Sequence, residues 1–354
     1  MKIKRITVEA TKVYDITVPE TECFFANGIL VHNCAEITLA NSDLYGCLSS
    51  KTGKHEVMDD GLIALCTLAA INVGKLPTTI TDADREMIAK AGEMLVRGLD
   101  ALLDYQDYAH SAAYRHTMLY RPLGIGVIGY AHWLAKGGLR WGAQNSVEQT
   151  EDLFELISYN LIRSSINLAK EKGRIQGKTK FDDGIMPIDT ATVKPINLKL
   201  DWQVLRDAAR QYGIRNATLM ALMPSENSSI LSNETNGIEP PRSLVTVKGS
   251  KEGQFSQVAP EFSRLNHLYQ TLWEVESIDY LTNVASMQKF VCQSISTNTT
   301  YDPSKGQIKM SKLIGDLLFA YKKGLKTLYY CQVNDVDGSM DDTDDDGCGG
   351  ACKV

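Results

Sequence analysis

The tripeptide His-Asn-Cys at residues 32–34 carries three side chains that together can cut and rejoin a peptide chain. The Asn33 amide can attack its own backbone carbonyl and cleave the chain behind it, if a neighbouring imidazole such as His32 assists proton transfer. The Cys34 thiolate can accept an acyl chain by thioester exchange. Alone, the tripeptide is equally consistent with an ordinary β-hairpin that ends at a turn.

Thiols form a second group of candidate residues. The chain has eight cysteines, too sparse for a disulfide scaffold and without the Cys-x-x-Cys pairs of a zinc ribbon, so we expect most of them to be core residues. Cys348 and Cys352 differ, because they follow an acidic stretch at residues 341–346 and are separated by glycines. A tail this polar is not expected to pack, so this pair can close to a disulfide and exchange with other thiols.

Composition excludes several classes of function. The net charge of -6 provides no basic field for phosphate backbones, which argues against nucleic-acid or anionic-membrane binding. No apolar run approaches the roughly 18 residues that a membrane span needs, and the N-terminus does not resemble a signal peptide. We therefore expect a cytoplasmic protein with no membrane partner.

The elements that must position these residues fall into two groups. Residues 2–18 contain short β-favouring runs, and the run at residues 23–25 leads through an Asn-Gly turn at 27–28 to Ile-Leu-Val at 29–31. This predicts a small all-β unit. After residue 34, helical and strand patterns alternate, which predicts an α/β fold.

Four segments define that α/β pattern. Residues 61–73 are a near-continuous apolar run, expected to be a strand buried on both faces with Cys66 in its middle, and 216–223 is a second buried strand. Thr81 is the expected N-cap of one helix, and a second spans 148–172 with Gly173 as its C-cap. A last helix is expected at 308–328, ending at Tyr329-Tyr330. The side chains expected to face inward include Ile88, Ala91, Leu95, Leu99, Leu102 and Leu103 on the first helix, and Leu313, Leu317, Ala320 and Leu325 on the last.

Two further patterns have competing interpretations. Gly-Ile-Gly-Val-Ile-Gly at residues 124–129 fits a dinucleotide-binding motif, but it lies in a strand-like run, where glycines more often allow close backbone approach. Residues 224–229, Pro-Ser-Glu-Asn-Ser-Ser, follow a predicted strand and form either a phosphate cradle or a polar turn. Residues 233–242 are too rich in turn formers for a regular element.

Residues 1–33 resemble the C-terminal splicing block of an intein, on the runs at 13–18 and 24–31 before His32-Asn33-Cys34. The resemblance implies that His32 assists the proton transfer, that Asn33 cyclises and that Cys34 receives the upstream segment. It also implies that Asp15 tunes the splicing reaction. Glu22 stands where this block usually carries a further His. Because the block with the N-terminal nucleophile is not in this sequence, we expect a split-intein C-terminal fragment that works in trans with a separate N-terminal piece.

From Cys34 to the C-terminus the chain resembles the catalytic (large) subunit of class I ribonucleotide reductase. The motifs are Cys-Ala-Glu at 34–36, Ala-Leu-Cys-Thr at 64–67, Arg-Pro-Leu-Gly-Ile-Gly-Val at 121–127, Met-Pro-Ser-Glu at 223–226, Asn-Gly-Ile-Glu-Pro-Pro-Arg at 236–242, Tyr-Tyr at 329–330 and the tail cysteines. The resemblance implies that Cys34 is the thiyl radical that takes a hydrogen atom from C3′ of the ribose. It implies that Glu36 is the base for the 3′-hydroxyl and that Cys66 is one member of the reducing thiol pair.

The same resemblance implies the partners. Ser225, Glu226, Asn227 and Ser228 would hold the diphosphate of a ribonucleoside diphosphate, although Asn227 replaces the expected Thr. Tyr329 and Tyr330 would relay the radical from a separate metal-containing small subunit, with no cofactor or metal in this chain. Cys348 and Cys352, spaced one residue closer than expected, would re-reduce the active site and pass the disulfide to thioredoxin or glutaredoxin.

The family fold is a ten-stranded α/β barrel built from two halves, and this chain is expected to hold the second half at residues 34–331. Residues 1–33 would be the intein fragment and 332–354 a disordered tail. We therefore expect a reductase for DNA synthesis, in a bacterium or a virus-infected cell, that is active only after splicing to its N-terminal half. The alternatives are a splicing element with a reductase remnant, a radical enzyme of another class, and a non-enzymatic binding module.

Overall fold

The computed structural model describes residues 35–39, 61–108, 110–250 and 253–334, together with the backbone of four short strands before residue 58. Strand β1 (Cys23–Ala26) pairs antiparallel with β2 (Ile29–His32), and β3 (Gly46–Leu48) pairs with β4 (His55–Val57). The predicted pairing of the strands on either side of residues 27–28 is confirmed. The other strands expected between residues 2 and 18, and the tail after residue 334, lie outside the described residues.

Parallel strands form the centre of the fold. β5 (Leu68–Asn72) pairs in parallel with β6 (Gly124–Ile128). Residues 218–222 lie along the other edge of β6, where the Ile125 amide donates to the Leu219 carbonyl at 2.8 Å. Parallel neighbours need crossover connections, and helices supply them here.

The same series continues to the end of the described chain. Residues 293–296 lie along 218–222, and the Leu222 amide donates to the Ser294 carbonyl at 3.1 Å. β9 (Thr299–Tyr301) follows directly and pairs in parallel with β10 (Cys331–Val333). The prediction of an α/β fold is therefore confirmed, with parallel segments placed in the order of the chain.

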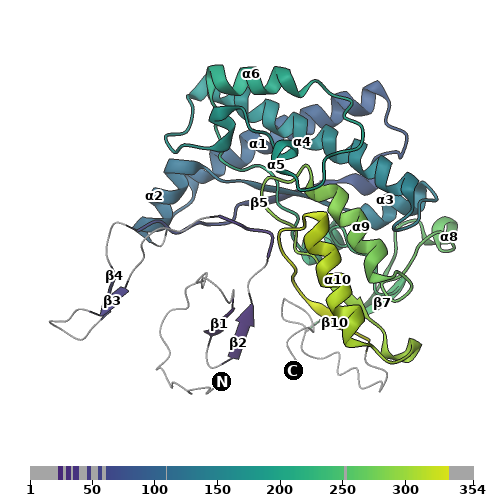
Figure 1. Cartoon of the computed structure of the whole chain (residues 1–354). Coiled ribbons are helices and arrows are strands. Elements are labelled where there is room, and N and C mark those ends of the chain that lie inside the picture. Colours follow the sequence, from purple (N-terminus) through teal and green to yellow (C-terminus); the bar gives the residue numbers. More distant parts are fainter. Residues whose placement is uncertain are drawn as a thin grey trace.

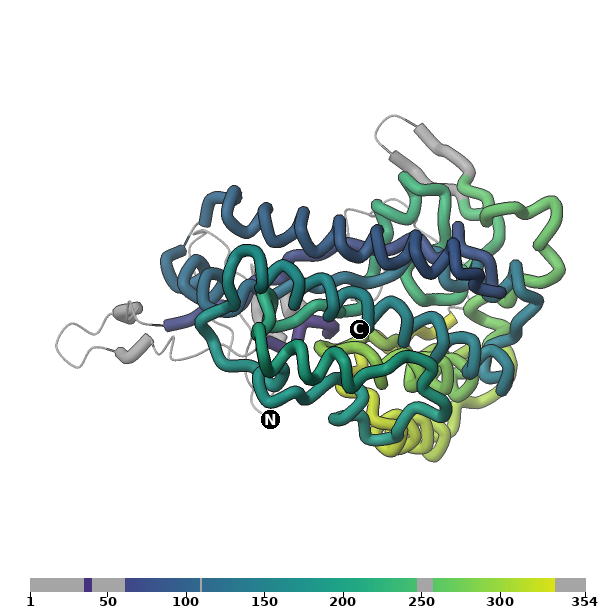
Figure 2. The backbone as a smooth tube through the Cα atoms, turned by 90° about the horizontal axis from the view of Figure 1, so that it is seen from above, coloured from purple at the N-terminus to yellow at the C-terminus, as the bar shows by residue number. Residues whose placement is uncertain are grey.

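Helices join and cover these segments (Figure 1). The helices are α1 (Asp82–Tyr105), α2 (Ser111–Tyr120), α3 (Tyr130–Lys136), α4 (Gln144–Lys172), α5 (Pro187–Thr190), α6 (Trp202–Tyr212), α7 (Glu226–Leu231), α8 (Phe262–Leu265), α9 (Ser277–Gln288) and α10 (Met310–Lys323). Short 3₁₀ turns are η1 (Val73–Lys75), η2 (Lys180–Asp183) and η3 (Pro303–Lys305), and β7 (Val245–Ser250) pairs with β8 (Gly253–Val258) as a hairpin. Figure 2 shows α1 and α4 side by side along their length. Across the described ranges, no helix combines the length and apolar character needed to cross a bilayer.

The helix ends predicted at Thr81 and Gly173 are confirmed, but α4 begins at Gln144 instead of 148, and α10 ends at Lys323 instead of 328 because Gly324 caps it. Thr81 caps α1 by accepting from the Asp84 amide at 3.3 Å, and the Asp84 carboxylate accepts from the Thr81 amide at 2.9 Å, which forms a capping box. α4 ends at Gly173, whose φ of 88° lies in the region that favours glycine.

The inward faces of two helices differ from the prediction. Leu102 is 44% exposed and Leu317 is 54% exposed, although both were expected to face the core. Ile88 and Leu103 on α1 and Ala320 on α10 are buried as expected, but Asp100 on α1 and Asp316 on α10 are buried as well. Each helix is turned so that a carboxylate reaches a partner, and Asp316 accepts from the Tyr301 hydroxyl at 3.1 Å.

The strand expected at residues 61–73 is shorter than predicted. β5 begins only at Leu68, which is 37% exposed, so Cys66 precedes the strand rather than lying in its middle. The first half of the apolar run is tied to α2 instead, since the Ile63 amide donates to the Ala112 carbonyl at 3.2 Å.

The glycine-rich stretch at 124–129 is a strand, as expected. All five residues of β6 are buried, and a Cβ on Gly126 would lie 2.8 Å from the Ala221 carbonyl oxygen. Gly129 follows with a φ of 78° and leads into α3. The glycines of β6 therefore allow neighbouring parallel segments to approach closely, and they do not form a phosphate-binding turn.

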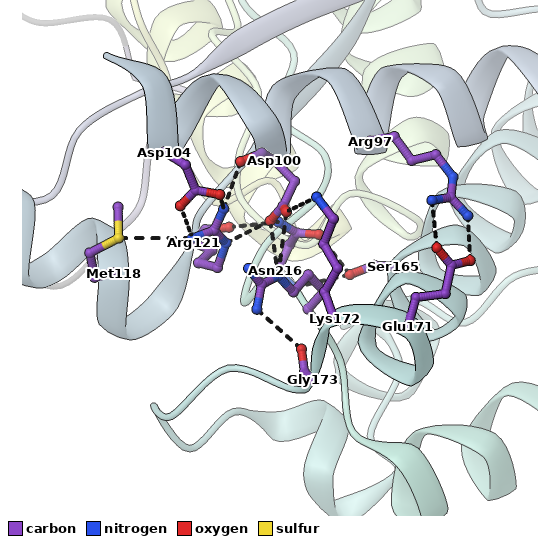
Figure 3. A network of polar contacts seen from close by, with 11 residues as sticks. Arg97, Asp100, Asp104, Met118, Arg121, Ser165, Glu171, Lys172, Gly173 and Asn216 are labelled. Atoms are coloured by element: carbon purple, nitrogen blue, oxygen red, sulfur yellow. Dashed lines mark hydrogen bonds and ion pairs between the residues drawn. The ribbon is translucent and has the colours of Figure 1, made fainter. Parts of the chain in front are cut away.

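A buried carboxylate ties the helices to the strands (Figure 3). The Asp100 side chain is fully buried and accepts from Arg121 Nε at 2.6 Å, Asn216 Nδ2 at 3.2 Å and Arg215 Nε at 3.3 Å. Arg121 caps α2, and Asn216 begins the third parallel segment. This cluster joins α1, α2 and the strand that leads to residues 224–229.

We predict that Asp100→Asn lowers the free energy of unfolding by roughly 3 kcal/mol, because it leaves buried guanidinium charges without their shared carboxylate. Asp104→Asn is the matched control. Asp104 also binds Arg121, but its side chain is 51% exposed, so we expect a loss of about 1 kcal/mol or less. Urea unfolding of both variants measures the difference, and equal losses would contradict this role for Asp100.

Candidate functional site

Glu36 is buried against the fourth parallel segment, residues 293–296. Its side chain is 1% exposed and accepts a short hydrogen bond from the Ser296 hydroxyl. The main chain is held too, because the Ala35 amide donates to Ser296 Oγ at 3.0 Å and the Ser294 amide donates to the Glu36 carbonyl at 2.9 Å. Burial raises the pKa of Glu36, and the Ser296 hydrogen bond offsets part of that rise. A carboxylate with a raised pKa is suited to accept and return a proton.

The segment after Cys66 reaches the same region. The Gly124 amide donates to the Thr67 carbonyl at 2.9 Å. A Cβ on Gly124 would lie 2.6 Å from Leu68 Cδ2 and 3.6 Å from Ile37 Cδ1. Cys66 is exposed, and the residues just after it approach those just after Glu36 around Gly124.

The polar loop at 225–229 is the start of α7. The Ser225 amide donates to Asn236 Oδ1 at 2.7 Å, and Asn236 Nδ2 donates to Glu226 Oε1 at 3.1 Å. Asn227 and Ser228 are exposed, as is Glu226. Residues 233–242 form no regular element, as expected. Through the two hydrogen bonds of Asn236, this loop holds the start of α7 in place.

Tyr329 and Tyr330 stand next to each other with their rings in contact. The ring centroids are 3.7 Å apart and the planes are tilted by 39°. The Tyr329 amide donates to the Thr297 carbonyl at 2.8 Å, and the Tyr330 amide donates to Asn298 Oδ1 at 3.0 Å. Both tyrosines are therefore held by residues that directly follow the segment holding Glu36.

Ser296, Asn298 and Glu239 are parts of the site that were not among the residues predicted from the sequence. Asn298 Nδ2 donates a short hydrogen bond to the Glu239 carboxylate. Burial raises the pKa of Glu239 to about 7, and the nearby charge of Glu226 adds to the rise. Glu239 lies in the motif at 236–242 and could have been singled out there, but no local pattern marks the two residues far from it.

Several predicted residues are not placed by the structure. Asp15, Asn33, Cys34, Cys348 and Cys352 lie outside the described residues, and only the backbone of His32 is described, in β2. The structure does bring the supports of Glu36 and of the tyrosine pair onto one segment, 293–299. In the part of the chain that the structure describes, no three His, Cys, Asp or Glu side chains gather as a possible metal site.

Comparison with known proteins gives a consistent result. The model of the family "Ribonucleotide reductase, barrel domain" matches residues 29–331. The ribonucleoside-diphosphate reductase subunit alpha of Haemophilus influenzae is 42% identical over 380 aligned residues, which cover 99% of this chain and 49% of the relative. Subunit alpha of reductase 1 from Escherichia coli is 48% identical over 271 residues, covering 71% of this chain and 35% of the relative. Subunit alpha from enterobacteria phage T4 is 40% identical over 321 residues, which cover 87% of this chain and 40% of the relative.

The chain spans about half, or less, of the length of these curated relatives. The matched range contains Glu36, Cys66, the start of α7 and the tyrosine pair, all in the order expected from the motifs. The chain therefore belongs to the ribonucleotide reductase barrel-domain family and is a homologue of the alpha subunits of ribonucleoside-diphosphate reductases.

Proposed function

We propose that this chain supplies the C-terminal part of a class I ribonucleotide reductase catalytic subunit, which converts ribonucleoside diphosphates to deoxyribonucleoside diphosphates. One observation carries the proposal. Residues 293–299 hold the buried Glu36 through Ser294 and Ser296, and hold the tyrosine pair through residues 297–299. A single segment thus supports both a proton acceptor beside Cys34 and a pair of phenol rings in contact.

The proposed chemistry uses Cys34, Glu36 and Cys66. The Cys34 thiyl radical takes the hydrogen atom from C3′, and Glu36 accepts the proton of the 3′-hydroxyl, which helps the 2′-hydroxyl leave as water. Two thiols then supply the two electrons of the reduction and become a disulfide, and the hydrogen atom returns from Cys34 to C3′. Cys66 is one of these thiols, and the other belongs to a part of the subunit outside this sequence.

The remaining roles rest on the resemblance of the motifs to those of the family. Ser225, Glu226, Asn227 and Ser228 lie at the start of α7 and hold the substrate diphosphate. Tyr329 and Tyr330 carry the radical from a metal-containing small subunit to Cys34. Cys348 and Cys352 re-reduce the active-site disulfide and pass it on to thioredoxin or glutaredoxin. A reducing cytoplasm suits a chain that works through thiols.

We further propose that Cys34 becomes part of the reductase by protein trans-splicing. The support is the residue pattern before Cys34, with Asp15, His32 and Asn33 at the positions of an intein C-terminal block. The hairpin of β1 and β2 leads directly to the junction. In this scheme a separately encoded N-terminal half carries the complementary intein piece.

Mixing the chain with that N-terminal half should give a ligated product that has lost residues 1–33, as followed by intact mass. Asn33→Ala should stop at a branched intermediate, because the amide that cleaves the junction is gone. Cys34→Ser should still splice slowly and give an inactive reductase, because a serine hydroxyl does not form the radical. Reductase activity of the unspliced chain alone would contradict the scheme.

Glu36→Gln should lower the turnover of the assembled enzyme by about 10²-fold or more, because the amide cannot accept the 3′-hydroxyl proton. In the unmodified enzyme, turnover should fall as the pH drops through the raised pKa of Glu36, since the base is then protonated. Glu148→Gln, on the exposed side of α4, is the matched control and should change neither turnover nor its pH profile. Equal turnover in the two variants would remove Glu36 from the mechanism.

Tyr329→Phe and Tyr330→Phe should each abolish turnover, because phenylalanine cannot be oxidised and deprotonated as a phenol can. Substrate binding should remain within about twofold, since neither ring is expected to hold the substrate. Tyr105→Phe, where Tyr105 is 88% exposed at the end of α1, should leave turnover unchanged. Steady-state assays of the assembled enzyme and equilibrium binding of the diphosphate separate the two effects, and residual turnover in either relay variant counts against the relay.

A further inference from the structure

We propose that Glu239 is a positioning residue for the radical relay, which fixes the main chain of Tyr330 through the side-chain amide of Asn298. The inference rests on the proposed function, in which Tyr330 carries the radical. Glu239 is not expected to touch the substrate or to carry the radical itself. Its effect on the reaction is transmitted by Asn298.

The geometry consists of two hydrogen bonds made by one amide group. Asn298 Nδ2 donates to the Glu239 carboxylate, and Asn298 Oδ1 accepts from the Tyr330 amide at 3.0 Å. Asn298 is 3% exposed. Because Nδ2 and Oδ1 of Asn298 are both hydrogen-bonded, the side-chain amide has one orientation. The position of Glu239 therefore determines where Oδ1 lies relative to the Tyr330 amide.

Tyr329 lacks this link. Its amide donates to the Thr297 carbonyl, a main-chain contact that does not involve Asn298 or Glu239. The contact between the two rings, with centroids 3.7 Å apart, therefore depends on different anchors: the Thr297 carbonyl for Tyr329, and the Asn298 side chain together with the Thr299 amide for Tyr330. A change at Glu239 should move Tyr330 relative to Tyr329, and not the pair as a unit.

Charged and titratable groups face Glu239 from three elements. Glu226 at the start of α7 and burial raise the pKa of Glu239, Arg242 in the same loop lowers it, and the resulting value is about 7. Tyr280 on α9 is buried beside it, and burial together with the charge of Glu239 raises the pKa of that phenol. Because the pKa is raised, Glu239 is protonated below about pH 7 and ionised above it.

The two protonation states should hold Asn298 differently. An ionised carboxylate accepts a stronger hydrogen bond than a protonated one. Above neutral pH the amide of Asn298 is held firmly and Tyr330 is fixed, and below it the anchor loosens. Glu239 therefore couples the position of the relay tyrosine to pH, whereas a carboxylate that only filled space would not.

The first test uses the chain itself, isotope-labelled at the tyrosine nitrogens, with the Tyr329 and Tyr330 signals assigned through the two Phe variants. The Tyr330 amide resonance should shift with pH with a midpoint near the value of about 7 for Glu239, and the Tyr329 resonance should shift much less. Glu239→Gln should abolish the Tyr330 titration. Glu86→Gln, exposed on α1, is the matched control and should leave it unchanged.

The second test uses the assembled enzyme. Glu239→Gln should lower kcat by about tenfold with KM within about twofold, the size expected for losing one hydrogen bond to a charged group. Asn298→Ala should produce a similar loss, and the double variant should lose no more than Asn298→Ala alone, because both changes break one chain of contacts. Additive losses would show that Glu239 acts independently of Asn298 and would overturn the inference.

The two tests separate failure of the inference from failure of the proposed function. A Tyr330 amide that does not titrate, or that titrates equally in Glu239→Gln, overturns the inference whether or not the enzyme is active. An assembled enzyme without reductase activity would refute the proposed function, while the amide titration would still decide whether Glu239 controls the Tyr330 main chain. Glu239→Asp keeps the charge on a shorter side chain and should retain the Tyr330 titration. This variant shows whether the loss of titration in Glu239→Gln comes from the missing charge or from misfolding.

Discussion

The hydrogen bond from Ser296 to the buried Glu36 carboxylate joins parts of the chain 260 residues apart, and the candidate site depends on it. Ser296 also binds the Ala35 amide, so one hydroxyl fixes both the main chain and the side chain at the start of the reductase motif. The strand that presents Ser296 is itself held by Leu222, whose amide and carbonyl bind on either side of Ile295. The position of Glu36 is thus set by the register of neighbouring parallel segments and not by its own short stretch of chain.

Three buried carboxylates, Asp100, Glu36 and Glu239, are stabilised by two different kinds of partner. Asp100 is surrounded by cationic side chains and an amide, the arrangement expected where a charge stabilises the fold. Glu36 and Glu239 form no salt bridge with any described residue, and each has a short hydrogen bond from a neutral donor. Burial raises the pKa of both carboxyl groups, which is the pattern of groups that exchange protons. This difference from Asp100 supports the roles proposed for Glu36 and Glu239.

Local signals in the sequence were sufficient for the helix ends at Thr81 and Gly173, the α/β alternation and the rejection of a dinucleotide site. Thr81 and Gly173 act through residues adjacent in the chain, and the glycines of β6 lie in a strand-like run, so pattern alone predicts all three features. The faces of α1 and α10 were predicted less well because hydrophobic periodicity cannot anticipate that Asp100 and Asp316 would be buried by partners elsewhere in the chain. Ser296 and Asn298 could not be predicted at all, since their roles exist only once residues 293–299 lie beside the segments containing Glu36 and Tyr330.

The same long-range contacts bear on the proposal that splicing and reduction share Cys34. Ala35 and Glu36 bind Ser294 and Ser296 in the chain that still carries residues 1–33. In the proposed scheme, these two residues are therefore held in place before cleavage at Asn33. Because Cys34 precedes this anchored main chain, ligation would place it next to Glu36, the proposed base. The proposed junction would tolerate an intein because the segment at 293–296, and not the residues that precede Cys34, determines where Glu36 lies.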